Sequence, residues 1–96
     1  MNKRITVSAI RKAAIQLMQE NGNTTTLAVK NHLRVQGYWA LQAEVSAIME
    51  KVAVQEGWFW QCNGHYRQYA LFPEMMPNVY APMMRGGEVI RFLFLN

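Results

Sequence analysis

The chain has 96 residues, 51% of them hydrophobic and 17% charged. This balance indicates a single globular domain and excludes a disordered chain. The single cysteine, Cys62, excludes an internal disulfide and a cysteine-only metal cage. We find no secretory signal and no apolar run long enough to span a bilayer, so we expect a cytoplasmic protein without a membrane partner.

The formal net charge is +4, and most of the excess lies near the N-terminus. Four cations precede residue 26 against one anion, Glu20; they are Lys3, Arg4, Arg11 and Lys12. This distribution suits an anionic partner such as a nucleic acid.

Three helices are predicted in chain order. The first runs from Thr6 or Ser8 to Asn21, on apolar residues at helical spacing. The segment "NTTT" (23–26) favours a short strand, with Thr26 as the N-cap of a second helix from Leu27 to Val35. The third begins near Trp39 or Ala40 and ends before Gly57. Its expected core stripe is Leu41, Val45, Ile48 and Val52.

The stretch "GWFWQCNGHYRQYALF" (57–72) predicts a β-hairpin with Asn63-Gly64 as a two-residue turn. This turn would place opposite each other the pairs Cys62–His65, Gln61–Tyr66, Trp60–Arg67, Phe59–Gln68 and Trp58–Tyr69. Trp58 and Tyr69 are then expected in the core, and Arg67 on the ring of Trp60.

Residues 73–96 differ in composition, being rich in proline and methionine. We expect residues 1–72 to form one domain, followed by an irregular extension that ends in a strand from Glu88 to Leu95. Both faces of that strand are largely apolar, so it must be covered. It would either join the hairpin sheet or form a homodimer with a second subunit.

The order of helix, short strand, two helices joined at "VQGYWA" (35–40) and hairpin resembles the winged helix-turn-helix family, an α+β fold. The resemblance covers residues 6–72. It implies that the third helix enters a DNA major groove while the hairpin, the wing, contacts the backbone or minor groove.

On this resemblance the expected function is nucleic-acid binding, of DNA more than RNA, with a possible role in transcription regulation. The candidates nearest the bases are Trp39, Gln42 and Ser46, with His65 and Tyr66 at the wing tip. The candidates for phosphate contact are Lys3, Arg4, Arg11, Lys12, Lys30, Arg34 and Arg67.

A second hypothesis is a protein–protein interaction module that uses the third helix, the wing or the C-terminal strand. It is suggested by the three glutamates of the third helix, Glu44, Glu50 and Glu56. Cys62 and His65 lack the further ligands of a zinc site and the orienting group of a nucleophile. No paired carboxylates, phosphate loop or triad can be assembled, so we expect no enzyme, metal or cofactor.

Overall fold

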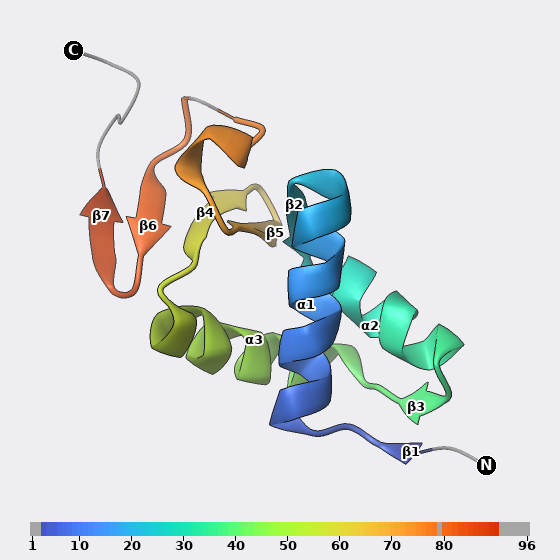
Figure 1. Cartoon of the computed structure of the whole chain (residues 1–96). Coiled ribbons are helices and arrows are strands. Elements are labelled where there is room, and N and C mark those ends of the chain that lie inside the picture. Colours follow the sequence, from blue (N-terminus) through green and yellow to red (C-terminus); the bar gives the residue numbers. More distant parts are fainter. Residues whose placement is uncertain (1–2, 79, 91–96) are drawn as a thin grey trace.

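The structure is a computed structural model that describes residues 3–78 and 80–90. Three helices pack beside a mostly antiparallel sheet (Figure 1), which confirms the predicted α+β class. The helices are α1 (Val7–Asn21), α2 (Thr26–Val35) and α3 (Gln42–Glu56). The strands are β1 (Lys3–Arg4), β2 (Asn23–Thr25), β3 (Tyr38–Trp39), β4 (Phe59–Asn63), β5 (Tyr66–Ala70), β6 (Met83–Arg85) and β7 (Glu88–Ile90), with a 3-10 turn at Pro73–Met75.

Threonine side chains begin the first two helices. The Ala9 N–H donates to Thr6 Oγ1 at 3.0 Å, and the Ala28 N–H donates to Thr25 Oγ1 at 3.1 Å. The prediction of Thr26 as the second N-cap was therefore wrong by one residue, because Thr26 is already helical and buried. Each such cap stabilises its helix by about 1 kcal/mol.

The core lies between the three helices and the inner face of the hairpin. Val45 and Val52 of the predicted stripe are buried, together with Met49, which the sequence analysis did not place there. Leu41 is 40% exposed, contrary to prediction. It precedes α3 in extended conformation, because Tyr38 and Trp39 form β3 instead of beginning the helix. Trp58 and Tyr69 are buried in this core, as predicted.

The larger sheet has the order β2-β5-β4-β6-β7. A separate pair of two-residue strands, β1 and β3, runs parallel and joins the start of the chain to the segment before α3. Neither strand was predicted, since two residues are too few for a pattern of alternation. This pair places Lys3 beside Tyr38 and Arg4 beside Trp39.

The hairpin register differs from the prediction. Trp60 pairs with Tyr69, Cys62 with Arg67 and Asn63 with Tyr66, so the turn residues are Gly64 and His65. The predicted pairs were wrong because Asn63 belongs to β4, and Gly64, with φ of +70°, begins the turn. The shift moves the turn by one residue and keeps the same side chains on each face, because strand faces alternate with period two.

Part of the C-terminal extension joins the sheet. β6 pairs with β4 and β7 pairs with β6, both antiparallel. Phe59 packs on the outer face of the hairpin against the buried side chains of Ala70, Met76 and Met83. Of the predicted strand Glu88–Leu95, residues 88–90 form β7, and residues 91–95 lie outside the described residues. A homodimer through this strand stays a prediction.

Within residues 3–78 and 80–90, none of the helices has both the length and the apolar character needed to cross a bilayer.

Candidate nucleic-acid interface

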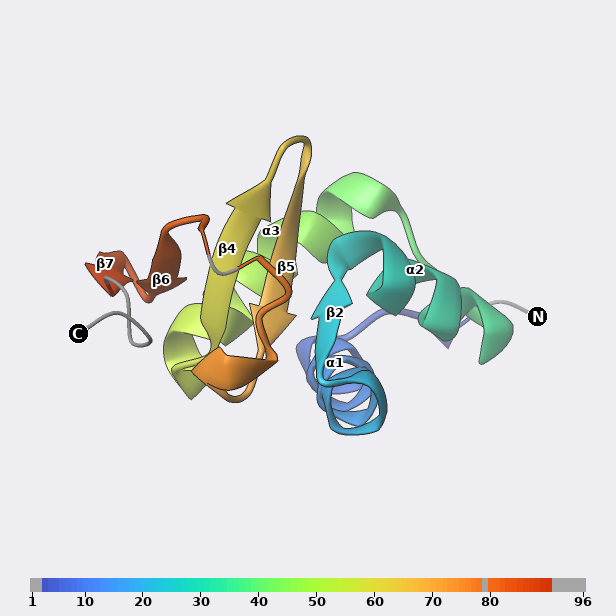
Figure 2. The ribbon, with the colours of Figure 1, turned by 90° about the horizontal axis from the view of Figure 1, so that it is seen from above.

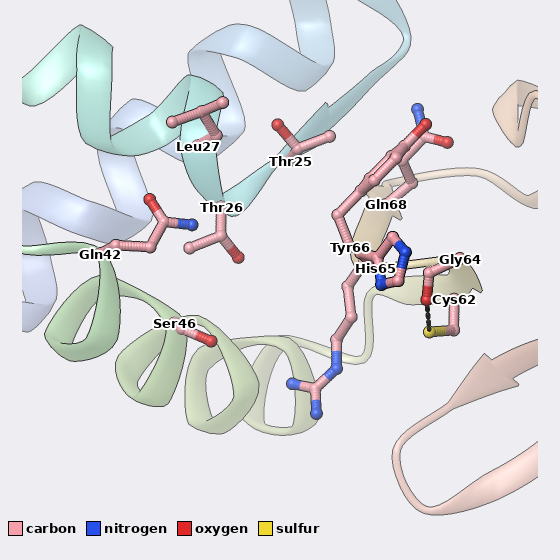
Figure 3. A pocket seen from close by; sticks show the side chains of 11 residues that line it. Thr25, Thr26, Leu27, Gln42, Ser46, Cys62, Gly64, His65, Tyr66 and Gln68 are labelled. Carbon is pink, nitrogen blue, oxygen red and sulfur yellow. Dashed lines mark hydrogen bonds between the residues drawn. The ribbon is translucent and has the colours of Figure 1, made fainter.

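A groove separates the start of α3 from the hairpin. It has a volume of about 650 Å³ and is lined by the start of α2, two residues of α3 and the end of the hairpin. Figure 3 shows Gln42 and Ser46 on one side of the groove, and His65, Tyr66 and Gln68 on the other. Most of the residues that line the groove have uncharged polar side chains, so they offer hydrogen-bond donors and acceptors to a ligand. We call this the α3–hairpin groove.

One flank of α2 extends the groove toward the N-terminal end of the molecule. Leu27, Lys30 and Arg34 are spaced by three and four residues and so share a side of the helix. Leu27 lines the groove, and Arg34 Nε donates to the carbonyl of Ala40, just before α3, at 2.8 Å. Lys30 therefore lies between the groove and Arg34.

Aromatic side chains hold the cations at the end of this flank. The Arg34 guanidinium lies 5.4 Å from the ring centre of Trp39, and Trp39 pairs in register with Arg4. The Lys3 ammonium lies 4.4 Å from the ring centre of Tyr38. Trp39 is 55% exposed and offers the rest of its surface to a ligand. The β1–β3 pairing thus adds two cations that sequence spacing alone could not place.

Arg67 lies where the hairpin meets α3. It forms an ion pair with Glu50, and its guanidinium lies 5.3 Å from the ring centre of Trp60. The predicted Trp60–Arg67 contact is confirmed, although the two residues are diagonal neighbours and not directly opposite. Burial alone would lower the pKa of Arg67, but the neighbouring Tyr69 hydroxyl and Glu50 carboxylate raise it. Arg67 therefore stays charged.

The residues along the groove, the flank of α2 and the β1–β3 pair are together called the α2–α3 face. It comprises Lys3, Arg4, Leu27, Lys30, Arg34, Trp39, Gln42, Ser46, His65, Tyr66 and Arg67. Two predicted site residues, Arg11 and Lys12, belong to α1 and do not line the groove. Figure 2 shows α1 on the side of the molecule away from the end of the hairpin.

Six residues that line the groove were not among the predicted site residues. Cys62 was weighed only as a metal ligand or nucleophile, and the other five were assigned only structural positions: Thr25, Thr26, Leu27, Gly64 and Gln68. The threonine run was the available signal, because a helix that begins at a threonine cap presents its first residues and free N–H groups at one end. Gln68 gave no local signal, since the pairing of β2 with β5 brings it there.

The remaining chemistry is limited. Over residues 3–78 and 80–90, no three His, Cys, Asp or Glu side chains come close enough to hold a metal ion. The Cys62 thiol is exposed and lies 3.7 Å from the carbonyl oxygen of Gly64, as the dashed line in Figure 3 marks. No family model, no curated protein and no solved structure matches the chain.

Proposed function

We propose that the chain is a small nucleic-acid-binding protein of winged-helix type. In this proposal α3 lies in the major groove of a DNA duplex, the β4–β5 hairpin is the wing, and the flank of α2 follows the backbone. One observation carries the proposal: the α2–α3 face joins cations, amide and hydroxyl groups and an exposed tryptophan on one surface.

Each part of that surface has a role in the proposal. Gln42 and Ser46 are exposed or half-buried near the start of α3, where an amide can bond the edge of adenine and a hydroxyl can bond a base or a phosphate. Arg4, Lys30 and Arg34 supply charge for the phosphates on one side of α3. Arg67 supplies it on the side of the wing.

A salt titration with matched variants tests the proposal. Mixed-sequence duplex DNA is titrated at low and moderate salt with the wild type and two double variants. Arg4→Gln/Lys30→Gln removes two cations from the α2–α3 face, and Arg11→Gln/Lys12→Gln removes two from α1. If both cations contact phosphates, the first variant lowers the slope of log K against log salt by about 1.8, or 0.9 for each contact. The second leaves the slope unchanged.

Two results would overturn the proposal. One is the absence of salt-dependent binding by the wild type at micromolar protein. The other is an equal loss in both double variants, which would indicate that net charge alone causes the binding.

One observation favours the alternative, a winged-helix protein–protein interaction module. Of the described residues that line the α3–hairpin groove, Arg67 is the one Lys or Arg, and Glu50 already pairs with it. A neutral polar groove suits a peptide segment. A protein captured in the presence of nuclease, and lost with Gln42→Ala/Ser46→Ala, would support this alternative over DNA binding.

A further inference from the structure

The chain contains two Asn-Gly dipeptides, Asn21-Gly22 and Asn63-Gly64. Asparagine followed by glycine can deamidate, because the glycine nitrogen can attack the asparagine side-chain carbonyl without hindrance from a side chain. The reaction also requires the glycine amide to be free and the local backbone to move. The two sites differ sharply in these respects.

Asn21-Gly22 is restrained. Asn21 is the last residue of α1, and the Gly22 N–H donates to the carbonyl of Met18 at 2.8 Å. Met75 also covers this glycine, because a Cβ at Gly22 would lie 3.2 Å from the Met75 sulfur. The helix end and the covering side chain together hold this amide in place.

Asn63-Gly64 is open on its glycine side. Gly64 is exposed in the hairpin turn, and a Cβ there would meet no atom within 4 Å. The turns and loops of residues 3–78 and 80–90 contain no backbone hydrogen bond from the Gly64 N–H. The nucleophile is therefore accessible at this site.

The Asn63 side chain belongs to an amide network formed by Asn23, Gln61, Asn63, Gln68 and Asn78. Asn63 Nδ2 donates to the side-chain oxygens of Gln61 (3.1 Å) and Gln68. Gln61, which is fully buried, in turn donates to the Asn78 carbonyl at 2.9 Å and accepts from the Asn78 N–H at 3.1 Å.

The other branch of the network ends at Met75. Gln68 Nε2 donates to Asn23 Oδ1 at 3.0 Å, and Asn23 Nδ2 donates to the Met75 carbonyl at 3.0 Å. Two anchors of the extension, at Met75 and at Asn78, thus connect through side-chain amides to Asn63.

We propose that Asn63 is a deamidation site and that its conversion releases the extension from these two anchors. The Gly64 nitrogen forms a bond to Asn63 Cγ while the Cγ–Nδ2 bond breaks, and ammonia leaves with the proton lost by Gly64. Water then opens the cyclic imide to aspartate or isoaspartate. The net change is the addition of one water and the loss of one ammonia.

Aspartate at position 63 disturbs the network, because each amide in it donates with its nitrogen and accepts with its oxygen in a fixed arrangement. A carboxylate at position 63 can still accept from Asn78 Nδ2, which donates to Asn63 Oδ1 at 3.3 Å. It has no N–H, however, and so faces the side-chain oxygens of Gln61 and Gln68 without a donor. If Gln61 turns its amide to donate to this carboxylate, its oxygen faces the Asn78 carbonyl. If the Gln68 amide turns instead, the Asn23 amide must also turn to donate to it. Asn23 then loses its hydrogen bond to the Met75 carbonyl. Either adjustment breaks an anchor.

Ageing of the intact protein tests both halves of the proposal. The folded wild type is incubated at mildly alkaline pH, and its peptides are mapped by mass with an assay for isoaspartate. We expect modification at Asn63 well before Asn21. Hydrogen exchange of the Asn78 amide in the aged protein should then be roughly tenfold faster or more, because the network loses at least two net hydrogen bonds.

Matched variants separate the modification from general damage. Asn63→Asp should speed exchange at Asn78 without ageing, whereas Asn21→Asp, with the same change of charge, should not. Equal modification of Asn21 and Asn63 would overturn the assignment of the site. Unchanged exchange at Asn78 in both aged wild type and Asn63→Asp would overturn the release. Neither readout involves nucleic acid, so the outcome is independent of the proposed function.

Discussion

Arg67 of the hairpin forms an ion pair with Glu50 of α3, and this pair stands between two cavities. On one side lies the α3–hairpin groove, and on the other lies a smaller cavity of about 250 Å³ beside Trp60 and Tyr69. Arg67 lines both. The pair neutralises the one Lys or Arg among the described residues that line the groove, so it sets how much positive charge the groove presents.

Glu50→Gln should therefore strengthen nucleic-acid binding. The substitution frees Arg67 and removes a carboxylate that repels phosphates, so the slope of log K against log salt should steepen by up to about 0.9. The pair is partly exposed, with 34% and 50% of the two side chains accessible. Its loss should cost about 1 kcal/mol or less of unfolding free energy. Duplex titration and thermal unfolding measure the two effects.

Glu56→Gln is the control for that experiment. It makes the same change of charge at the last residue of α3, at the end away from Gln42. A gain in affinity as large as that of Glu50→Gln would contradict a specific role for the ion pair.

Gln61→Ala should destabilise the fold more than a glutamine-to-alanine change on the surface does. Its side chain is fully buried and makes two hydrogen bonds to the backbone of Asn78. Removing it leaves those groups without partners, at a cost of about 1–3 kcal/mol. Denaturant unfolding measures the loss, and Gln55→Ala, at an exposed position of α3, should change stability by less than about 0.5 kcal/mol.

Tyr69 should make the fold sensitive to alkaline pH. Burial raises the pKa of Tyr69 above its ordinary value of 10.0, so the folded state keeps the phenol proton more firmly than the unfolded state does. The resulting stability is fully present below pH 10 and is lost as pH rises through the folded pKa. Tyr69→Phe should flatten this loss above pH 10. Its stability at neutral pH should change little, since the buried hydroxyl has no hydrogen-bond partner among the described residues.

Unfolding by denaturant at several values of pH between neutral and strongly alkaline checks this prediction. An equally steep alkaline loss in Tyr69→Phe would assign the effect to another group.

Arg34→Lys should reduce stability although it keeps the charge. Arg34 Nε bonds the Ala40 carbonyl and the guanidinium covers Trp39, and an ammonium cannot reproduce both contacts. We expect a loss of about 1 kcal/mol by denaturant unfolding. Lys30→Arg, one turn earlier on the same flank, should be neutral. Equal stability of Arg34→Lys and wild type would show that the contact with Ala40 is dispensable.

The helices and the existence of the hairpin were predictable, because their signals are local. Thr6 is a cap before an apolar repeat, and Asn63-Gly64 lies between two β-prone runs. The register of the hairpin was not predictable, because hydrogen bonds with Gln61, Gln68 and Asn78 hold Asn63 in β4. Such contacts between side chains produce no periodic pattern in the sequence. β6 was missed for the same reason: its partner β4 lies more than twenty residues earlier.

Individual residues of the candidate site could be predicted from the sequence, but their arrangement in space could not. Helical spacing gave Lys30 and Arg34, and the third helix gave Gln42 and Ser46. The position of Lys3 and Arg4 depends on the parallel pairing of β1 with β3, and the separation of Arg11 and Lys12 depends on how α1 packs. Tertiary packing decides which of the cations share a side.

The strand order has a consequence for behaviour at high concentration. The five-residue strand β4 would be an open edge if the sheet ended with the hairpin, and long open edges recruit strands from other molecules. β6 occupies that edge, and the outermost described strands, β2 and β7, are three residues each. Short edges give little backbone to pair with. The described fold therefore protects itself against edge-to-edge aggregation by placing a three-residue strand at each edge of the sheet.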